Sequence, residues 1–362
     1  MINLDVHIGG LAAAHQWQRT CLFLYVGSRK LQVNMTKQIS SDSTAILMLC
    51  THLGLSTDPG PAPLTLRQWN PLARKLVAAS LSPGDLLGSS SNEIAEILNL
   101  EAGYADRLAR LLERGGVIAI ELERLESRGI WVWTRADTDY PKKYRQRLKE
   151  SAPSVLFGAG DKDLPGQPGL AVVGSRDVDD AGKHVAEFVG NACDHHGLIV
   201  YSGGARGVDL ITMRSALEGR GYSVGILPHN LESAIRKQDY RRALREGNLT
   251  LLTPYSPSAG FSAGGAMGRN KLIYTLADYA LVVASAANKG GTWGGSTEAL
   301  KKRWLPVFVV DGPNVPEGNR LLLEKGALPF PMPFPADISE FRVWLEEQRK
   351  GFQPPADQHK LM

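Results

Sequence analysis

The sequence predicts an α/β fold in which a small helical domain precedes a doubly wound, mostly parallel sheet. Six short apolar runs alternate with amphipathic segments in the second half of the chain. Each run is continuously apolar, as expected for strands that are buried on both faces of a parallel sheet. The segment before them has apolar residues at helical spacing instead. Together these patterns are typical of a Rossmann-like sheet with helices on both faces.

The composition permits many functions and excludes a few. The 362 residues include 41 Lys and Arg against 37 Asp and Glu, a formal net charge of +4. This small excess permits a nucleic-acid partner without requiring one. Cys21, Cys50 and Cys193 lie far apart with no CxxC pair, which argues against a zinc site or a disulfide framework. No apolar run approaches the roughly 18 residues of a membrane span. We therefore expect a cytoplasmic protein with no metal, no cofactor and no membrane contact.

Changes in pattern along the chain divide it into five segments. Residues 1–34 have no amphipathic period, and Met35 opens a stretch that reads like an ordinary start. We therefore expect a non-native or disordered extension, with translation starting at Met35 instead of Met1, and we expect its removal to leave folding and binding intact. The predicted segments are an extension at 1–34, a helical N-terminal domain at 35–128, connecting strands and a linker at 129–165, the Rossmann-like domain at 166–335, and a C-terminal helix and tail at 336–362.

The helical domain is predicted from apolar spacing. Ile94, Ile97 and Leu98 fall on one helical face, and Ser91 or Asn92 is expected to cap that helix. A second apolar stripe is formed by Leu108, Leu111 and Leu112.

Strands and helices then follow in order to the end of the chain. Two short strands, at 130–134 and 154–160, precede a Pro/Gly-rich turn at 161–169 that we place at the edge of the main domain. The six strands of the main domain are expected at 170–175, 198–204, 222–228, 250–256, 279–285 and 306–312. Their helices are expected at 180–197, 205–221, 231–247, 264–278, 293–304 and 318–326, and a last helix at 338–350.

Glycine, arginine and hydroxyl residues gather where these strands end. Glycine lets a backbone approach a phosphate closely, and the free N–H groups of a helix start bind it. Ligands of open parallel sheets bind at the carboxyl ends of the strands, so these loops predict a phosphate-binding rim. The residues assigned to this rim are Gly174, Ser175, Arg176, Ser202, Gly203, Gly204, Arg206, Gly207, Arg269, Asn270, Lys271, Gly291 and Thr292.

Arg206 is of special interest within "YSGGARGVDL". The helix is predicted to begin near Ala205, which places Arg206 in its first turn. A cation is unfavourable at the positive end of a helix dipole. We therefore interpret Arg206 as a ligand-binding residue that supplies a charged fork to a phosphate.

Other patterns leave alternatives open. No Walker loop, GxGxxG spacing or HExxH is present. Glu298, next to a Gly-rich loop, is the candidate general base if the protein is an enzyme. A second basic patch is either a solvated helix face or an edge that follows a polyanion, with Tyr240 available for base stacking. This patch comprises Arg236, Lys237, Arg241, Arg242 and Arg245 on one predicted helix.

Taken together, these motifs resemble the DNA-processing protein A family, DprA (also called Smf). The stretches that carry the resemblance are "GSR", "YSGGARGVDLITMRSAL", "GRNKLIYTLADYALVVASA" and "VFVVDGPNVPEGNRLLLEKGA", within roughly 121–330. The resemblance implies an extended Rossmann fold that binds single-stranded DNA, forms homodimers and hands DNA to a RecA-type recombinase, without known enzymatic activity. It implies phosphate contacts for Gly174, Ser175, Arg176, Ser202, Gly203, Arg206, Gly207, Arg269 and Asn270.

The chain departs from the family pattern at several positions. Gly204 and Met213 replace a usual Leu and His, Lys271 replaces an Arg, and Ser285 replaces an acidic residue. We also expect no counterpart of the winged helix that ends many members. We therefore expect a divergent paralogue that acts in DNA recombination or transformation, or with a neighbouring protein in an anti-phage defence module. The alternatives are a nucleotide-binding sensor and a LOG-like nucleoside-monophosphate phosphoribohydrolase.

Overall fold

The computed structural model describes residues 22–26, 29–33, 39–55 and 60–353. The chain divides into two units, Met1–Ile39 and Ser40–Met362. In the first unit, β1 (Leu22–Val26) and β2 (Arg29–Val33) pair as antiparallel strands. Part of the segment assigned to a non-native or disordered extension therefore holds two strands. The remainder of that segment lies outside the described residues, and its dispensability stays a prediction.

The second unit begins with helices. Ser90, one residue before the predicted caps, caps α3, and Glu93 completes a capping box with it. Ile94 and Leu98 are buried as predicted, whereas Ile97 is 52% exposed because it lies on the outer side of the helix. The helices of this part are α1 (Ser41–Cys50), α2 (Leu66–Ala78), α3 (Ser91–Leu98), α4 (Ala102–Leu112) and α5 (Gly115–Glu126), with a 3-10 turn η1 (Pro83–Leu86).

A nine-stranded sheet forms the centre of the second unit, in the order β11-β10-β9-β5-β6-β7-β8-β4-β3. The pairs from β5 to β11 are parallel, which confirms the predicted fold class. The strands are β3 (Ile130–Thr134), β4 (Val155–Gly160), β5 (Gly169–Val173), β6 (Ile199–Ser202), β7 (Ser223–Ile226), β8 (Leu249–Thr253), β9 (Tyr279–Val282), β10 (Val307–Asp311) and β11 (Leu328–Pro331).

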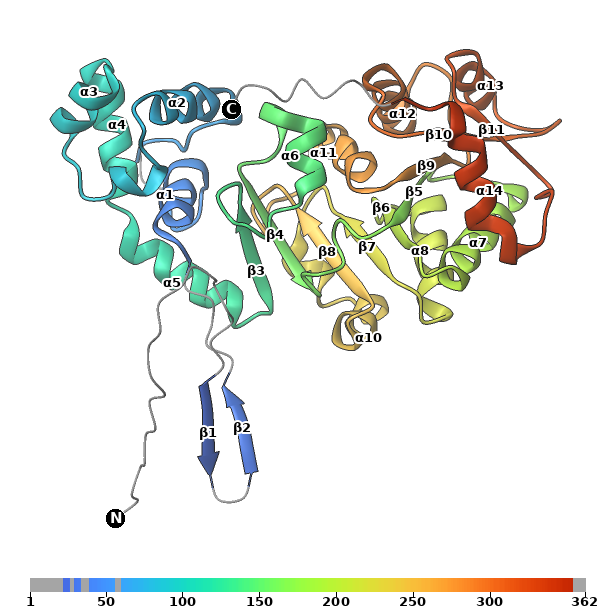
Figure 1. Ribbon diagram of the computed structural model, residues 1–362, viewed down its shortest axis with the longest axis horizontal. Coiled ribbons are helices and arrows are strands. Elements are labelled where there is room, and N and C mark those ends of the chain that lie inside the picture. Colours follow the sequence, from blue (N-terminus) through green and yellow to red (C-terminus); the bar gives the residue numbers. More distant parts are fainter. Residues whose placement is uncertain (1–21, 27–28, 34–38, 56–59, 354–362) are drawn as a thin grey trace. The chain divides into compact units, whose positions relative to one another are not determined.

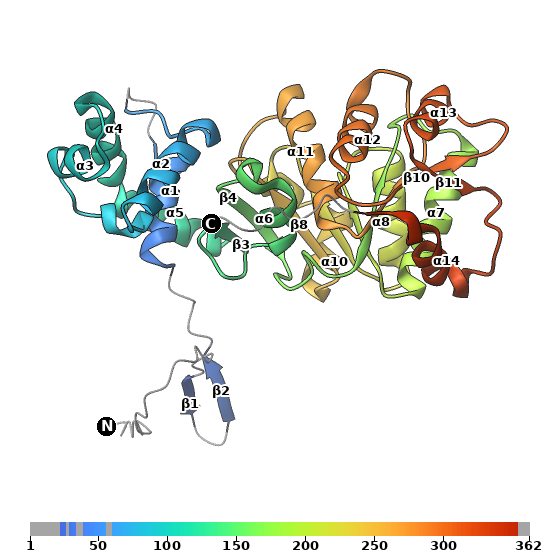
Figure 2. The ribbon, with the colours of Figure 1, turned by 45° about the horizontal axis from the view of Figure 1, so that its top comes forward.

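Helices cover both faces of this sheet (Figures 1 and 2). Each face has its own apolar cluster, one containing Tyr144 and Leu272 and the other Val189 and Met213. The first face carries α6 (Lys142–Leu148), α11 (Ala263–Leu276), α12 (Gly290–Lys302) and α13 (Glu317–Glu324). The second carries α7 (Asp180–His195), α8 (Val208–Glu218), α9 (Leu231–Ala234), α10 (Gln238–Glu246) and α14 (Phe341–Gln348), the last preceded by η3 (Ile338–Glu340) and followed by η4 (Arg349–Gly351).

The strand order reverses between β5 and β9. From β5 the chain adds β6, β7 and β8 on one side, then returns to add β9 and β10 on the other. The connections leaving β5 and β9 therefore part in opposite directions and leave a crevice beyond their carboxyl ends. The fold places the candidate site at this position.

The two strands assigned to a connecting segment are part of the same sheet. β4 pairs antiparallel with β8 and with β3, so they extend the sheet at one edge. A boundary at residue 166 would cut through this sheet, and the predicted domain limits stay a prediction. No helix among the described residues has the length and apolar character needed to cross a membrane.

Candidate functional site

A pocket of about 430 Å³ lies at the reversal point of the sheet. Loops after β5, β6 and β9 and the start of α11 form its walls. Part of the predicted phosphate rim meets here: Gly174, Ser175, Arg176, Arg269, Asn270, Gly291 and Thr292. The prediction that loops separated by more than 100 residues converge at one sheet edge thus agrees with the structure for these residues.

Arg269 is the most unusual side chain of the pocket. It lines the pocket from α11 and is only 5% exposed. Its Nε and Nη1 atoms have no hydrogen-bond partner among the described residues. Buried polar atoms are nearly always hydrogen-bonded, because an unpaired buried donor carries a desolvation penalty. The two nitrogens therefore indicate a missing acceptor, and a guanidinium favours a carboxylate or a phosphate.

Asp209, in the first turn of α8, is the buried carboxylate beside Arg269. Its Oδ2 accepts a hydrogen bond from the Gly203 N–H at 3.1 Å. Burial raises its pKa to about 6, while Arg269 and the backbone N–H groups of Ala205, Gly203 and Gly174 act in the opposite direction. Burial also lowers the pKa of Arg269. Asp209 therefore braces the loops after β5 and β6 and balances part of the charge of Arg269.

The start of α12 supplies backbone donors to the pocket. The N-cap residue Lys289 makes no side-chain cap hydrogen bond, so the first N–H groups of the helix are free of a side-chain partner. Thr292 Oγ1 donates to the Gly174 carbonyl at 3.1 Å, and Asn270 Nδ2 donates to the Gly291 carbonyl at 2.9 Å. These two bonds fix the helix start against β5 and α11. A helix N-terminus held in this way is suited to bind an anion.

Two glycines of the rim are required by packing. A Cβ on Gly203 would lie 2.0 Å from Arg269 Nη1 and 2.6 Å from Asp209 Oδ2. Gly207 has φ +88° and is the N-cap residue of α8, and a Cβ there would lie 2.3 Å from the Ser175 carbonyl oxygen. Both positions let loops of the site approach each other closely.

Several predicted rim residues do not line this pocket. Ser202 is buried and its Oγ donates to the Val172 carbonyl at 2.7 Å, so this hydroxyl links β6 to β5. Gly204, with φ +64°, belongs to the turn after β6. The predicted helix start near Ala205 is wrong: α8 begins at Val208, and Arg206 lies in the loop before it. Its side chain is 75% exposed and forms an ion pair with Asp177.

Lys271 and Glu298 line a different cavity, of about 810 Å³. Lys271 Nζ donates to the Ser151 carbonyl at 3.1 Å, and burial lowers its pKa. The hydrolase alternative needs Glu298 near the phosphate partners Arg269 and Lys271. The structure instead divides this set: Glu298 and Lys271 line the larger cavity, whereas Arg269 lines the pocket at the strand reversal.

The second basic patch is arranged differently from the prediction. The patch does not occupy one helix. The helical conformation is interrupted between α9 and α10, and Arg236 and Lys237 lie in that interruption. Arg241, Arg242 and Arg245 are exposed on α10. Tyr240 is only 5% exposed and packs in the core, so it offers no surface for base stacking.

Sequence reasoning missed several pocket residues, among them Phe261, Met267 and Lys289. Phe261 and Met267 line the pocket and are 58% and 63% exposed, and Lys289 lies directly before α12. Lys289 precedes a Gly-Gly pair and could have been included with that loop. No spacing in the sequence distinguishes the two apolar residues from core residues.

Comparison with known proteins agrees with this architecture. The sequence profile of the family described as DNA recombination-mediator protein A matches residues 131–334. DNA processing protein DprA of Streptococcus pneumoniae (strain ATCC BAA-255 / R6) is 28% identical over 181 residues, which cover 49% of this chain and 63% of that protein. Protein Smf of Escherichia coli (strain K12) is 27% identical over 181 residues, which cover 49% of this chain and 48% of that protein. The chain thus spans about half to two thirds of these relatives.

A solved structure shows the same fold. The X-ray structure of DNA processing protein A (DprA) from Streptococcus pneumoniae superposes with a TM-score of 0.58 at 21% sequence identity. The superposition covers 81% of this chain and 95% of that one. The likeness therefore extends beyond the segment that the family profile matches.

Proposed function

The chain belongs to the DNA recombination-mediator protein A family, and from that premise we propose that it binds single-stranded DNA through the pocket at the strand reversal. The observation that carries the proposal is Arg269, with two buried nitrogens that lack a partner among the described residues. A backbone phosphate supplies oxygen acceptors of the required charge and geometry. Further phosphate contacts are proposed for Ser175, Arg176 and the free N–H groups at the start of α12.

The experiment is a titration of oligothymidylates of increasing length at several salt concentrations. We expect affinity to rise with length and to fall with salt, with a slope of about −0.7 per phosphate contacted. Thymidine monophosphate serves as competitor. Tight binding of the monophosphate that an oligomer does not displace would overturn the proposal.

A free nucleotide is the second candidate ligand, because a pocket of about 430 Å³ is of the size that small ligands occupy. A sensor would bind a mononucleotide as tightly as an oligomer. A phosphoribohydrolase would release free base from a nucleoside monophosphate, which chromatography detects. The position of Glu298 outside this pocket favours binding over hydrolysis.

Finer parts of the proposal concern the biological setting. We propose that the protein acts in the cytoplasm as a homodimer and passes DNA to a RecA-type recombinase or to a neighbouring defence protein. The free thiols of Cys50 and Cys193 fit a reducing compartment. Light scattering measures the oligomeric state, and co-purification with a recombinase or with the products of adjacent genes separates the two roles.

A further inference from the structure

The cavity of about 810 Å³ that contains Lys271 is strongly basic. It lies between α6, α11 and α12, close to the points where β9 and β10 begin. Its charged lining has two carboxylates, Asp278 and Glu298. Six cations surround it: Arg147, Lys149, Lys271, Lys302, Arg303 and Arg349.

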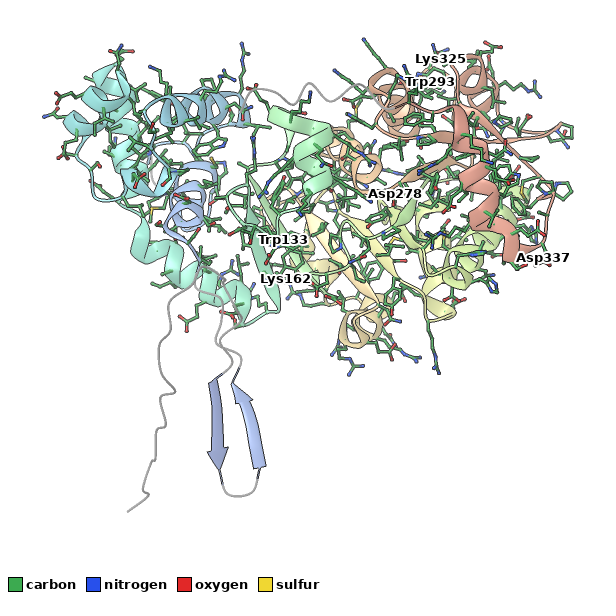
Figure 3. All side chains as sticks on the ribbon, viewed as in Figure 1. Trp133, Lys162, Asp278, Trp293, Lys325 and Asp337 are labelled. Atoms are coloured by element: carbon green, nitrogen blue, oxygen red, sulfur yellow. The ribbon has the colours of Figure 1, made fainter. Side chains whose placement is uncertain are left out.

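One of the two carboxylates already forms an ion pair with a residue outside the cavity lining. Asp278 (labelled in Figure 3) forms a 2.9 Å ion pair with Lys143, which does not line the cavity. Asp278 also accepts a hydrogen bond from the Gly169 N–H at 3.1 Å. Glu298 is therefore the one cavity-lining carboxylate left to oppose the six cations.

None of the six cations forms a direct ion pair with a carboxylate within the described residues. Arg147 and Lys271 donate to backbone carbonyls, and Arg349 donates to the Tyr279 hydroxyl at 3.4 Å. Lys149, Lys302 and Arg303 have neither a side-chain hydrogen bond nor an ion pair in the part of the chain described. Cations gathered in excess of nearby carboxylates repel each other, and a polyanion relieves that repulsion.

Two of these cations have an unusual backbone conformation. Lys149 has φ +51° and Arg303 has φ +50°, in the left-handed region that favours glycine. Arg303 is the C-cap residue of α12, a position at which glycine is usual. A residue with a side chain therefore occupies a position where glycine would be less strained, and strained positions gather at functional sites.

The cavity is connected to the reversal-point pocket by α12. Gly290, Gly291 and Thr292 at the start of this helix line the pocket, and Lys302 at its end lines the cavity. Twelve steps of 1.5 Å place the two helix ends about 18 Å apart, a distance that a few extended nucleotides span. We propose that this cavity is a second phosphate-binding segment of the DNA site, which holds the strand as it leaves the pocket along α12. The inference rests on the proposed function.

The test compares two neighbouring lysines of α12. Lys301 and Lys302 are both exposed, but only Lys302 lines the cavity, so Lys301→Glu is the matched control for Lys302→Glu. Both changes alter the same helix C-terminus and the same net charge. Binding is measured by fluorescence anisotropy for oligothymidylates of about 2 and about 20 nucleotides, because the shorter one cannot span the length of α12 and the longer one exceeds the usual site size of single-strand binders. Lys149→Gln, on another element, is a second cavity variant.

We expect Lys302→Glu to weaken binding of the long oligomer about tenfold and to reduce its salt slope by about 0.7 for each phosphate lost. Binding of the short oligomer stays within about twofold, because it occupies the pocket alone. Equal effects of Lys302→Glu and Lys301→Glu on the long oligomer, with Lys149→Gln silent, would overturn the inference while leaving the proposed function intact. If the unchanged protein binds neither oligomer, the proposed function fails and this inference fails with it.

Discussion

Arg269 and Arg206 look alike in the sequence and differ in the structure. Each lies in a glycine-rich stretch that follows a parallel strand. Arg269 is 5% exposed and has two nitrogens without a partner in the described part of the chain. The Arg206 side chain is 75% exposed and is paired with Asp177. An exposed ion pair contributes about 0–1 kcal/mol, whereas a buried unpaired donor is unfavourable until a ligand satisfies it.

From this difference we propose that Arg269, more than Arg206, is the ligand-binding arginine. Arg206 does not line the pocket, and its exposed guanidinium is already satisfied by water and by Asp177. Arg269 lies close to the backbone of Gly203 and within the electrostatic influence of Asp209. The predictions below test whether this contrast governs binding.

The largest effect is expected from Arg269→Ala. Losing two charged hydrogen bonds weakens binding of a long oligothymidylate about 100-fold, or ~2.7 kcal/mol. Arg269→Lys keeps the positive charge but loses the two-pronged guanidinium, so its affinity should lie between those of the unchanged protein and of Arg269→Ala. Fluorescence anisotropy measures both, and thermal unfolding verifies that each variant is folded. Unchanged affinity in a folded Arg269→Ala protein would place the site elsewhere.

Gly203→Ala should weaken binding about tenfold. The added methyl would lie 2.0 Å from Arg269 Nη1, so the guanidinium must move. A displaced fork loses its geometry although the charge remains. Gly294→Ala in α12 is the control, because a Cβ there meets no atom within 4 Å. If both variants bind like the unchanged protein, the position of Arg269 is not critical.

Because of Asp209, we expect the DNA affinity to change a few-fold with pH. Because burial raises its pKa to about 6, its contribution to stability is fully present below the unfolded pKa and is lost as pH rises through about 6. Binding follows the same direction: protonation removes a negative charge beside Arg269, so DNA affinity rises about threefold to tenfold as pH falls from about 7 to about 5.

Asp209→Asn should bind tightly at both pH values and show little of this dependence. His229, whose pKa burial lowers, titrates nearby, so His229→Gln is the control. A pH profile that persists in Asp209→Asn and disappears in His229→Gln would assign the effect to the histidine.

Arg206→Ala should have the smallest effect, about twofold to threefold in affinity, with an unchanged melting temperature. An exposed arginine contacts a phosphate that remains hydrated, and its ion pair with Asp177 contributes little to folding. A loss as large as that of Arg269→Ala would remove the contrast between the two arginines.

The sequence predicted the fold well because its signals are local. Continuous apolar runs predicted all six central strands, and their ends predicted the edge at which the pocket lies. β11 was not predicted, because its segment Leu328–Pro331 contains two prolines, which are confined to sheet edges. The break between α9 and α10 was also missed, since the segment has uninterrupted helical composition.

The site was predicted less completely because burial depends on packing between distant segments. Nothing near Ser202 indicates that its hydroxyl is bound to Val172, and nothing near Lys271 indicates that it faces away from Arg269. The unpaired state of Arg269 depends on α8, α11 and the loop after β6 together. Such a property appears only after the chain is folded.

Nitrogen-15 NMR of the arginine side chains tests the central claim most directly. The Nε–H signal of Arg269, identified by its loss in Arg269→Lys, is followed while a long oligothymidylate is added. Because a phosphate would complete the missing hydrogen bonds, we expect this signal to shift strongly and its proton to exchange more slowly, while the Arg206 signal changes little. An Arg269 signal that stays unchanged while the oligomer binds would contradict the account.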